Sequence, residues 1–354
     1  MEFLPQYVEI GNTLQIRYYG IIIVFAMLVA AFVASRLAKR DQQDPDHIWG
    51  ALTWAIIPAI IGARLWAILT PSASAIAAGQ TTQWYFENFF DMQNGAIAIW
   101  SGGLSVFGAV IGGAIGGYFY VRRHKLSVWQ YLDYAGVVLP LGQAIGRLAN
   151  YVNQELYGVP TTLPWGITID SAHRVEPYKS LIEYSLETRF HPLFLYEGLF
   201  NLGLFAVLFW LFRTKRRSMR YGDFFLIYLM AYSFVRFFLE FIRADVPTVA
   251  GINTSQGITL LTFVVAGVIF LYRWTRMPTV GEEPTERTLL TKSEKTALEE
   301  QKKKEKAQKK AAKQASTAAK SAEAPAPAAK PATPPPPVAS VPPAEPETSD
   351  TPPA

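Results

Sequence analysis

One apolar segment of the sequence ends in a charged and polar stretch, Gly146-Arg147-Leu148-Ala149-Asn150-Tyr151-Val152-Asn153. An ionised side chain at the centre of a membrane-spanning helix costs about 2.5–3.5 kcal/mol on insertion scales, so Arg147 needs a partner. Arg147, Asn150 and Asn153 lie on one helix face. Guanidinium and amide donors on one face are suited to hold phosphate or ester oxygens. Capping of the helix end by the two asparagines is the structural alternative.

A second set of charged residues, Arg236, Glu240 and Arg243, also shares one helix face. Such a row can be an internal salt bridge that neutralises Glu240, or a socket for an anionic head group. Two arginines face a single acid here, and Arg147 and Arg64 lie in other apolar segments, so positive charge is left over. Guanidinium groups match phosphate with paired donors, and we therefore expect a lipid phosphate as the counter-ion.

The composition indicates a membrane protein with a polar tail. Half of the 354 residues are hydrophobic, and charges are sparse before about residue 280. Beyond that point the chain turns to Lys, Glu, Ala and then Pro, which cannot bury enough apolar surface to offset the entropy of ordering. We expect a membrane domain over residues 1–278 and a disordered cytoplasmic tail over residues 279–354.

The chain contains no cysteine, which excludes a structural disulfide, a cysteine nucleophile and a thiolate metal site. The four histidines, His47, His124, His173 and His191, have no metal-ligand spacing, so we expect no metal and no other cofactor. The formal net charge of +5 comes mostly from basic loops beside apolar segments. Nothing in this pattern predicts a nucleic-acid partner.

Windows of about 20 mostly apolar residues have the length that a spanning helix needs. The first window lacks a preceding basic region and a cleavage site, so we expect it to be retained as a span. Basic residues follow alternate windows, whereas positions 70–94 contain no lysine or arginine. The positive-inside rule then places the N-terminus outside and the C-terminus in the cytoplasm. The all-α fold has these predicted spans: 19–36, 49–69, 96–120, 131–149, 192–212, 221–241 and 257–274.

With this orientation, the polar residues of six spans gather at the outer leaflet. Tyr19 begins the first span, Arg64 lies near the outer end of the second, and Gly102 and Gly103 open the third. The fourth ends in the Arg147 stretch, the fifth follows His191, and the sixth ends in the Arg236 row. Clustering at one depth favours a site over scattered packing contacts.

The connection over residues 150–191 is long, and loops of this length are usually functional or disordered. The apolar run Trp165-Gly166-Ile167-Thr168-Ile169 favours a small folded extracytoplasmic element between the fourth and fifth spans. The glycines Gly108, Gly112 and Gly116 recur every fourth position and predict close packing of the third span against another helix.

The pattern Gly146-Arg147-x-x-Asn150-x-x-Asn153-x-Glu155-x-x-Gly158 resembles the signature of the prolipoprotein diacylglyceryl transferases. Further matches cover residues from about 10 to 277 and leave only the tail uncovered. They are Arg17-Tyr18-Tyr19-Gly20, Trp100-x-Gly102-Gly103, His191-Pro192-x-x-Leu195-Tyr196-Glu197, Arg236-x-x-x-Glu240-x-x-Arg243 and Ser255-Gln256.

The resemblance implies a bacterial enzyme of the cytoplasmic (inner) membrane, with its active site towards the outer leaflet. It implies transfer of the diacylglyceryl group of phosphatidylglycerol to the lipobox cysteine of a prolipoprotein, with release of glycerol phosphate. We expect Arg147 and Arg236 on the lipid phosphate and Glu240 orienting an arginine. The expected pocket also contains Asn150, Asn153, Gly158, Arg64, Arg243, Gly102, Gly103 and His191. We expect a monomer.

One position departs from the family pattern. Many members carry a histidine where this chain has Phe107, and phenylalanine cannot take a proton. Either Tyr19, Glu155 or Glu240 is then the base, or the arginines lower the pKa of the substrate thiol. The segment His191-Pro192-Leu193-Phe194 also lacks the glutamine that follows His-Pro in some members.

Three other functions compete with transfer. Gly103-Leu104-Ser105-Val106-Phe107-Gly108 resembles the serine motif of rhomboid proteases, but no later span contains the histidine base which that chemistry needs. An anionic-lipid transporter or flippase would be expected to carry polar residues at the midplane and broken helices in two halves, which the sequence does not indicate. A non-catalytic lipid-binding scaffold fits if Phe107 marks lost activity.

Overall fold

The computed structural model describes residues 7–10, 14–245, 248–249, 252–281, 300–301, 303–304 and 306–308. The chain divides into two compact units, Met1–Thr288 and Leu289–Ala354. In the second unit the described residues are helical. Most of the predicted disordered tail lies outside the described residues, and its disorder and cytoplasmic location stay predictions.

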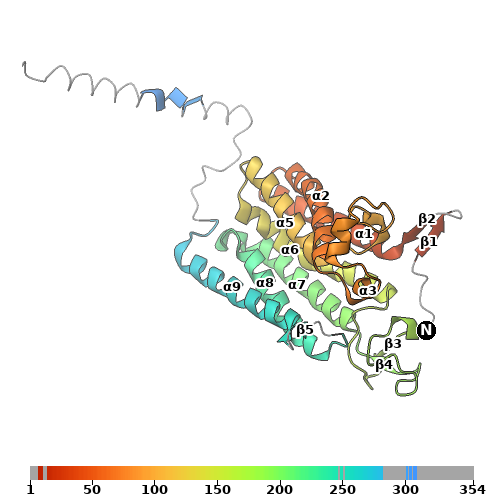
Figure 1. The fold of residues 1–354 in the computed structure, drawn as a ribbon. Coiled ribbons are helices and arrows are strands. Elements are labelled where there is room, and N and C mark those ends of the chain that lie inside the picture. Colours follow the sequence, from red (N-terminus) through yellow and green to blue (C-terminus); the bar gives the residue numbers. More distant parts are fainter. Residues whose placement is uncertain are drawn as a thin grey trace, which may run out of the picture. The chain divides into compact units, whose positions relative to one another are not determined.

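Seven long helices make up most of the described part of the first unit, and each overlaps a predicted span (Figure 1). Five of these helices are long and apolar enough to cross a membrane, namely α1, α2, α7, α8 and α9, which confirms the all-α membrane class. The count of seven spans and their orientation stay predictions, since α5 and α6 fall outside that set. The long helices are α1 (Tyr18–Arg40), α2 (Asp46–Leu69), α5 (Val106–Arg123), α6 (Val128–Val152), α7 (Leu193–Lys215), α8 (Asp223–Leu239) and α9 (Thr254–Arg276).

The predicted beginning of the third span was wrong, because the helix begins later in the sequence than expected. We expected a helix from residue 96, but α5 begins at Val106. Gly102 and Gly103 interrupt the helix with φ angles of +94° and +65°, in the left-handed region that favours glycine. Their carbonyls are turned towards Arg64, which donates to both. Three short elements precede this turn, α3 (Ala73–Ala77), α4 (Thr82–Glu87) and the 3₁₀ helix η1 (Ile99–Ser101).

Helices α2 and α5 approach each other closely along a line of glycines. A Cβ atom placed on Gly112 would lie 2.0 Å from the carbonyl oxygen of Pro58, and one on Gly108 would lie 2.0 Å from that of Gly62. Real side chains do not tolerate such distances, so only glycine permits this contact. The interpretation of the glycine repeat as a packing surface is confirmed.

Short antiparallel strand pairs lie outside the helices, and the connection after α6 is folded. Its core consists of Tyr157, Ile169 and Phe190. Burial raises the pKa of the Tyr157 hydroxyl, which accepts a hydrogen bond of 2.6 Å from the Val175 N–H. The folded element predicted here is therefore present. The strand pairs are β1 (Tyr7–Ile10) with β2 (Leu14–Arg17), β3 (Ile167–Thr168) with β4 (Arg189–Phe190), and β5 (Thr248–Val249) with β6 (Ile252–Asn253). A short helix, η2 (Ser171–His173), lies between β3 and β4.

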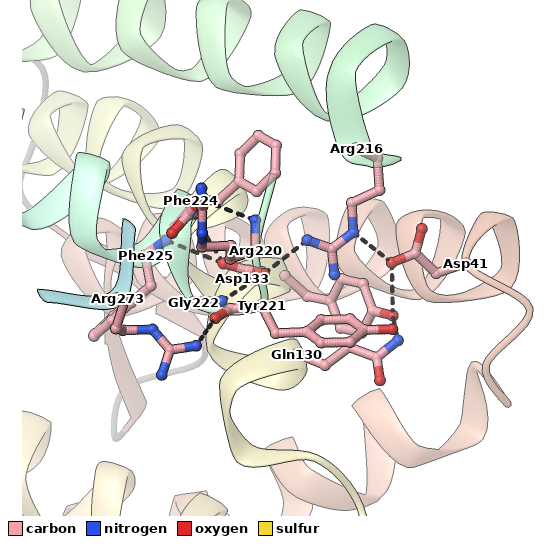
Figure 2. A network of polar contacts seen from close by, with 12 residues as sticks. Asp41, Gln130, Asp133, Arg216, Arg220, Tyr221, Gly222, Phe224, Phe225 and Arg273 are labelled. Carbon is pink, nitrogen blue, oxygen red and sulfur yellow. Dashed lines mark hydrogen bonds and ion pairs between the residues drawn. The ribbon is translucent and has the colours of Figure 1, made fainter. Parts of the chain in front are cut away.

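Asp133 of α6 joins the beginning of α8 to the rest of the helix bundle (Figure 2). Its fully buried carboxylate accepts hydrogen bonds from the backbone N–H groups of Gly222, Phe224 and Phe225, at 2.8, 3.0 and 3.4 Å. These are among the N–H groups that a helix leaves unpaired at its first turn. A side chain from α6 therefore caps α8 and also supplies negative charge where the helix dipole favours it.

Arg216 of the short helix η3 (Arg216–Ser218) connects this cap to α1. Its Nη1 lies 2.7 Å from Asp133 Oδ2, and its Nε lies 2.9 Å from Asp41 Oδ2 just beyond α1 (Figure 2). Arg273 of α9 donates to the carbonyl of Tyr221. The ends of α1, α6, α7, α8 and α9 thus meet in one polar network, which we call the helix-end clamp.

Replacing Asp133→Ala should destabilise the fold severely. The change leaves Arg216 without one carboxylate and three backbone N–H groups at the beginning of α8 without an acceptor. Breaking a buried ion pair on one side costs about 3–5 kcal/mol. Unfolding by sodium dodecyl sulfate in mixed micelles measures the effect, and Glu183→Ala on the exposed loop is the matched control. Equal unfolding midpoints for Asp133→Ala and the wild-type protein would contradict the importance of the clamp.

Candidate active site

Charged side chains of alternating sign form a row across the ends of α6, α7 and α8. Arg147 is paired with Glu197, and Glu197 Oε2 lies 3.7 Å from Arg236 Nη1. Arg236 Nη2 lies 2.8 Å from Glu240 Oε2, and Glu240 Oε1 lies 3.2 Å from Arg243 Nη1. Glu240 begins the short helix η4 (Glu240–Ile242), which follows α8. Only 3% of the Glu197 side chain and 0% of the Glu240 side chain are exposed. This alternating row begins and ends with an arginine.

Asn150 extends the row from Arg147 towards solvent. Its Oδ1 accepts a hydrogen bond of 3.0 Å from Arg147 Nη1, and its Nδ2 donates one of 2.7 Å to Glu155 Oε1. Asn150 is buried, whereas Glu155 is exposed. The Asn150 amide thus connects a buried cation to an exposed carboxylate instead of capping the helix. Asn153, by contrast, stands at the C-cap of α6, where its N–H donates to Ala149.

Tyr19 lies in the first turn of α1, close to this end of α6. The two helices are in contact here, because a Cβ atom on Gly146 would lie 3.5 Å from Ile23 Cδ1. The structure therefore brings Tyr19 towards the Arg147 stretch, as the sequence predicted.

Gly158 ties the loop after α6 to the segment that carries Arg243. Its N–H donates to the carbonyl of His191 at 2.8 Å, and the N–H of Val159 donates to that of Ile242 at 2.9 Å. A Cβ atom on Gly158 would lie only 2.4 Å from the Ile242 carbonyl oxygen. Glycine is required here by close approach, and His191 contributes through its backbone. The imidazole of His191 instead lies 3.1 Å from the Tyr196 hydroxyl.

Arg64, Gly102 and Gly103 lie in a separate arrangement between α2 and α5. The Arg64 guanidinium is buried and donates to the carbonyls of Ala96, Gly102 and Gly95, at 2.9, 2.7 and 2.6 Å. All three of its nitrogen atoms therefore donate to carbonyls of the loop before α5. No described contact joins Arg64 to the alternating row. The assignment of these three residues to phosphate binding stays a prediction that this geometry does not favour.

Phe107, the position at which the sequence departs from the expected pattern, lies in the first turn of α5. The residue is 59% exposed, and its ring packs against Trp66, with ring centroids 6.1 Å apart. The position therefore offers no group that takes or gives a proton.

Two residues of the site, Glu197 and Tyr232, were absent from the sequence-based set of site residues. Glu197 accepts from Arg147 and also from the Tyr232 hydroxyl, at 2.9 Å. A signal for Glu197 was available, because it is the only acidic residue between Leu193 and Lys215. An intramembrane acid is expensive and is a functional candidate by default. Tyr232 gives no comparable signal, since tyrosines are frequent in these helices.

The row carries more positive than negative charge. Three arginines face two buried carboxylates, which leaves one positive charge in excess within the buried part of the row, and the third carboxylate, Glu155, is exposed. The Nε atoms of Arg147 and Arg243 are buried without a hydrogen-bond partner in the part of the chain that the structure describes. Other parts of these two arginine side chains are open to solvent, since 18% of the Arg147 side chain and 16% of the Arg243 side chain are exposed. An anion with several acceptor oxygens fits such donors.

Comparison with known proteins identifies related sequences over the same region. The family model described as prolipoprotein diacylglyceryl transferase matches residues 5–272. A phosphatidylglycerol--prolipoprotein diacylglyceryl transferase from Chloroflexus aggregans is 34% identical, over 75% of this chain and 88% of the relative. Equally named proteins from Synechococcus elongatus and Leifsonia xyli subsp. xyli are 35% and 39% identical, over 76% and 73% of this chain and 87% and 74% of the relatives.

Replacing Gly158→Ala should disrupt the contact between the loop after α6 and the Arg243 segment. The added methyl group would clash with the backbone of Ile242, which cannot move aside as a flexible side chain can. Hydrogen exchange at the amides of Gly158 and Val159 measures the loss of protection. Gly257→Ala is the matched control, because nothing lies within 4 Å of a Cβ atom there. Unchanged protection in Gly158→Ala would contradict the close approach.

Proposed function

Because the chain belongs to the prolipoprotein diacylglyceryl transferase family, we propose that it transfers the diacylglyceryl group of phosphatidylglycerol to the cysteine thiol of a prolipoprotein. In this reaction a carbon–sulfur bond forms and the bond between the same carbon and a phosphate oxygen breaks. Glycerol phosphate leaves, and the thiol gives up its proton. The observation that carries the proposal is the alternating row with an arginine at each end.

Phosphate binding is the first task of the row. Arg147 and Arg243 carry donors that no described protein group uses, and the row has an excess positive charge. The leaving glycerol phosphate gains negative charge as the carbon–oxygen bond breaks. Guanidinium groups already fixed in place stabilise this charge without reorganisation of solvent. Arg147 and Arg236 contact the phosphate, while Glu240 holds Arg236 and Arg243.

Asn150 and Gly158 shape the rest of the pocket. The Asn150 amide keeps Arg147 beside the Glu155 carboxylate. Gly158 fixes the loop that carries the folded element after α6. We place the site at the outer leaflet of the bacterial cytoplasmic membrane, because the basic loops at the opposite helix ends follow the positive-inside rule. A precursor that emerges from translocation meets the site there.

Glu155 is the group that accepts the thiol proton in this proposal. Glu240 is fully buried and lies within salt-bridge distance of two arginines, so a thiol cannot approach it. Glu155 is exposed and its described hydrogen bond comes from the neutral Asn150 amide. The Asn150 amide connects this carboxylate to Arg147, whose positive charge favours the thiolate that forms. Tyr19 lies close to both groups and orients the substrate.

Replacing Arg147→Ala should lower the rate of thioether formation by at least about 10²-fold, because a preorganised donor to the leaving phosphate is lost. Purified full-length protein is assayed in phosphatidylglycerol vesicles with a lipobox peptide, and the product is detected by mass spectrometry. Arg123→Ala is the control, because Arg123 is exposed at the end of α5. Normal transfer by folded Arg147→Ala would refute the proposed role. Tight lipid binding or lipid transport by wild-type protein without thioether product would favour a scaffold or a flippase.

Replacing Glu155→Gln should slow transfer most at low pH. The ordinary pKa of a cysteine thiol is about 8.5, so near pH 6 almost all of the substrate needs a base. As the pH approaches that pKa, the substrate ionises in solution and the deficit of the variant should shrink. The ratio of wild-type to variant rates is measured across this range. A ratio that does not change with pH would exclude Glu155 as the proton acceptor.

A further inference from the structure

We propose that Glu197 is a positioning residue that sets the spacing and orientation of Arg147 and Arg236 for the departing phosphate. The inference rests on the proposed function, because it assigns a role within the same reaction. Glu197 touches two groups that contact the substrate in that proposal, and it is not itself a catalytic residue.

The contacts of Glu197 show why it is suited to this role. Oε1 is paired with Arg147 and accepts from the Tyr232 hydroxyl at 2.9 Å, while Oε2 lies 3.7 Å from Arg236 Nη1. Both oxygens are therefore engaged, on α6 and on α8 at once. The next residue is Gly198, where a Cβ atom would lie 3.4 Å from Arg147 Cβ. This is an ordinary van der Waals distance, so α6 and α7 are in direct contact beside the ion pair, and α7 also packs against α8 (Figure 1).

The negative charge of Glu197 is needed to hold Arg147 and Arg236 close together. Two guanidinium groups on adjacent helices repel each other strongly in a medium of low dielectric constant. A carboxylate between them offsets this repulsion and holds both in a fixed geometry with charge-assisted hydrogen bonds. Glu240 cannot substitute, because it binds Arg236 and Arg243 and has no described contact with Arg147. Glu197 is thus the link between the two halves of the row.

The expected kinetic signature separates positioning from simple stabilisation. Without the negative charge of Glu197 the row gains one positive charge, so ground-state attraction for anionic phosphatidylglycerol is not weakened. The leaving phosphate, however, requires both arginines in place when its charge increases. Loss of alignment therefore lowers kcat, while KM for phosphatidylglycerol stays constant or falls. A merely structural role changes the amount of folded protein and leaves kcat per folded molecule unaltered.

The test compares Glu197→Gln, Tyr232→Phe and the control Glu183→Gln, an exposed loop residue. Transfer is assayed in vesicles of varied phosphatidylglycerol content, and rates are normalised to folded protein. Glu197→Gln should lose at least about tenfold in kcat, with no increase in KM for phosphatidylglycerol beyond about twofold. Tyr232→Phe retains every charge and removes one hydrogen bond to Glu197, so it should show a smaller loss, also in kcat.

The kcat and KM values of these variants decide whether Glu197 positions the two arginines. Wild-type kcat in both folded variants would overturn the role of Glu197 while leaving the proposed transfer intact. An increase in KM with unchanged kcat would also overturn it, because Glu197 would then act only on ground-state binding. If Glu197→Gln does not fold, the kcat of Tyr232→Phe decides alone. A wild-type protein without thioether product would instead refute the proposed function.

Discussion

The buried carboxylate of Asp133 is the contact on which the arrangement of the helices depends. Three backbone N–H groups at the beginning of α8 and the guanidinium of Arg216 converge on it. A buried carboxylate without such partners would cost several kcal/mol, so the charge is tolerated only if all of these groups are in place. The same requirement fixes the beginning of α8 and the end of α7 relative to α6. Apolar side chains pack less specifically, because they have no directional partners to satisfy.

The helix-end clamp has consequences for the other end of the same helices. Asp133 and Arg147 are separated along α6 by about four turns, or about 21 Å, and therefore lie on nearly the same helix face. The face that receives α8 at the clamp thus presents Arg147 to α7 and α8 at the active site. Glu197 and Arg236 then complete the row from those two helices. Two polar networks at opposite ends of α6 consequently set both the position and the rotation of the helices between them.

Sequence patterns predicted the positions of the long helices well, because hydropathy measures how much of a segment can lie in lipid. They did not predict which partner a buried charge finds. Arg64 and Arg147 lie at similar positions in apolar segments, yet Arg64 donates to loop carbonyls and Arg147 pairs with Glu197. The predicted beginning of the third span was wrong, because Gly102 and Gly103 adopt positive φ angles before α5 begins. The carbonyls of these two glycines accept hydrogen bonds from Arg64 of another helix, a contact that hydropathy does not reveal. Glu197 belongs to a recognisable motif of the sequence, but its position between two arginines follows from the packing of α7 against α6 and α8.

The buried and exposed acids of this site are suited to different tasks. Glu197 and Glu240 are surrounded by arginines, and protonating either would leave buried guanidinium groups without counter-charge. A reaction that passes a proton through them would disturb the geometry of the arginines that we propose to bind the phosphate. Within the described part of the chain, the neutral Asn150 amide joins Glu155 to the row, so Glu155 can change its charge while the arginines keep their carboxylates. Phe107 packs against Trp66 and cannot take a proton. In the proposed reaction the proton therefore leaves through an exposed acid, while the buried acids keep the arginines in place.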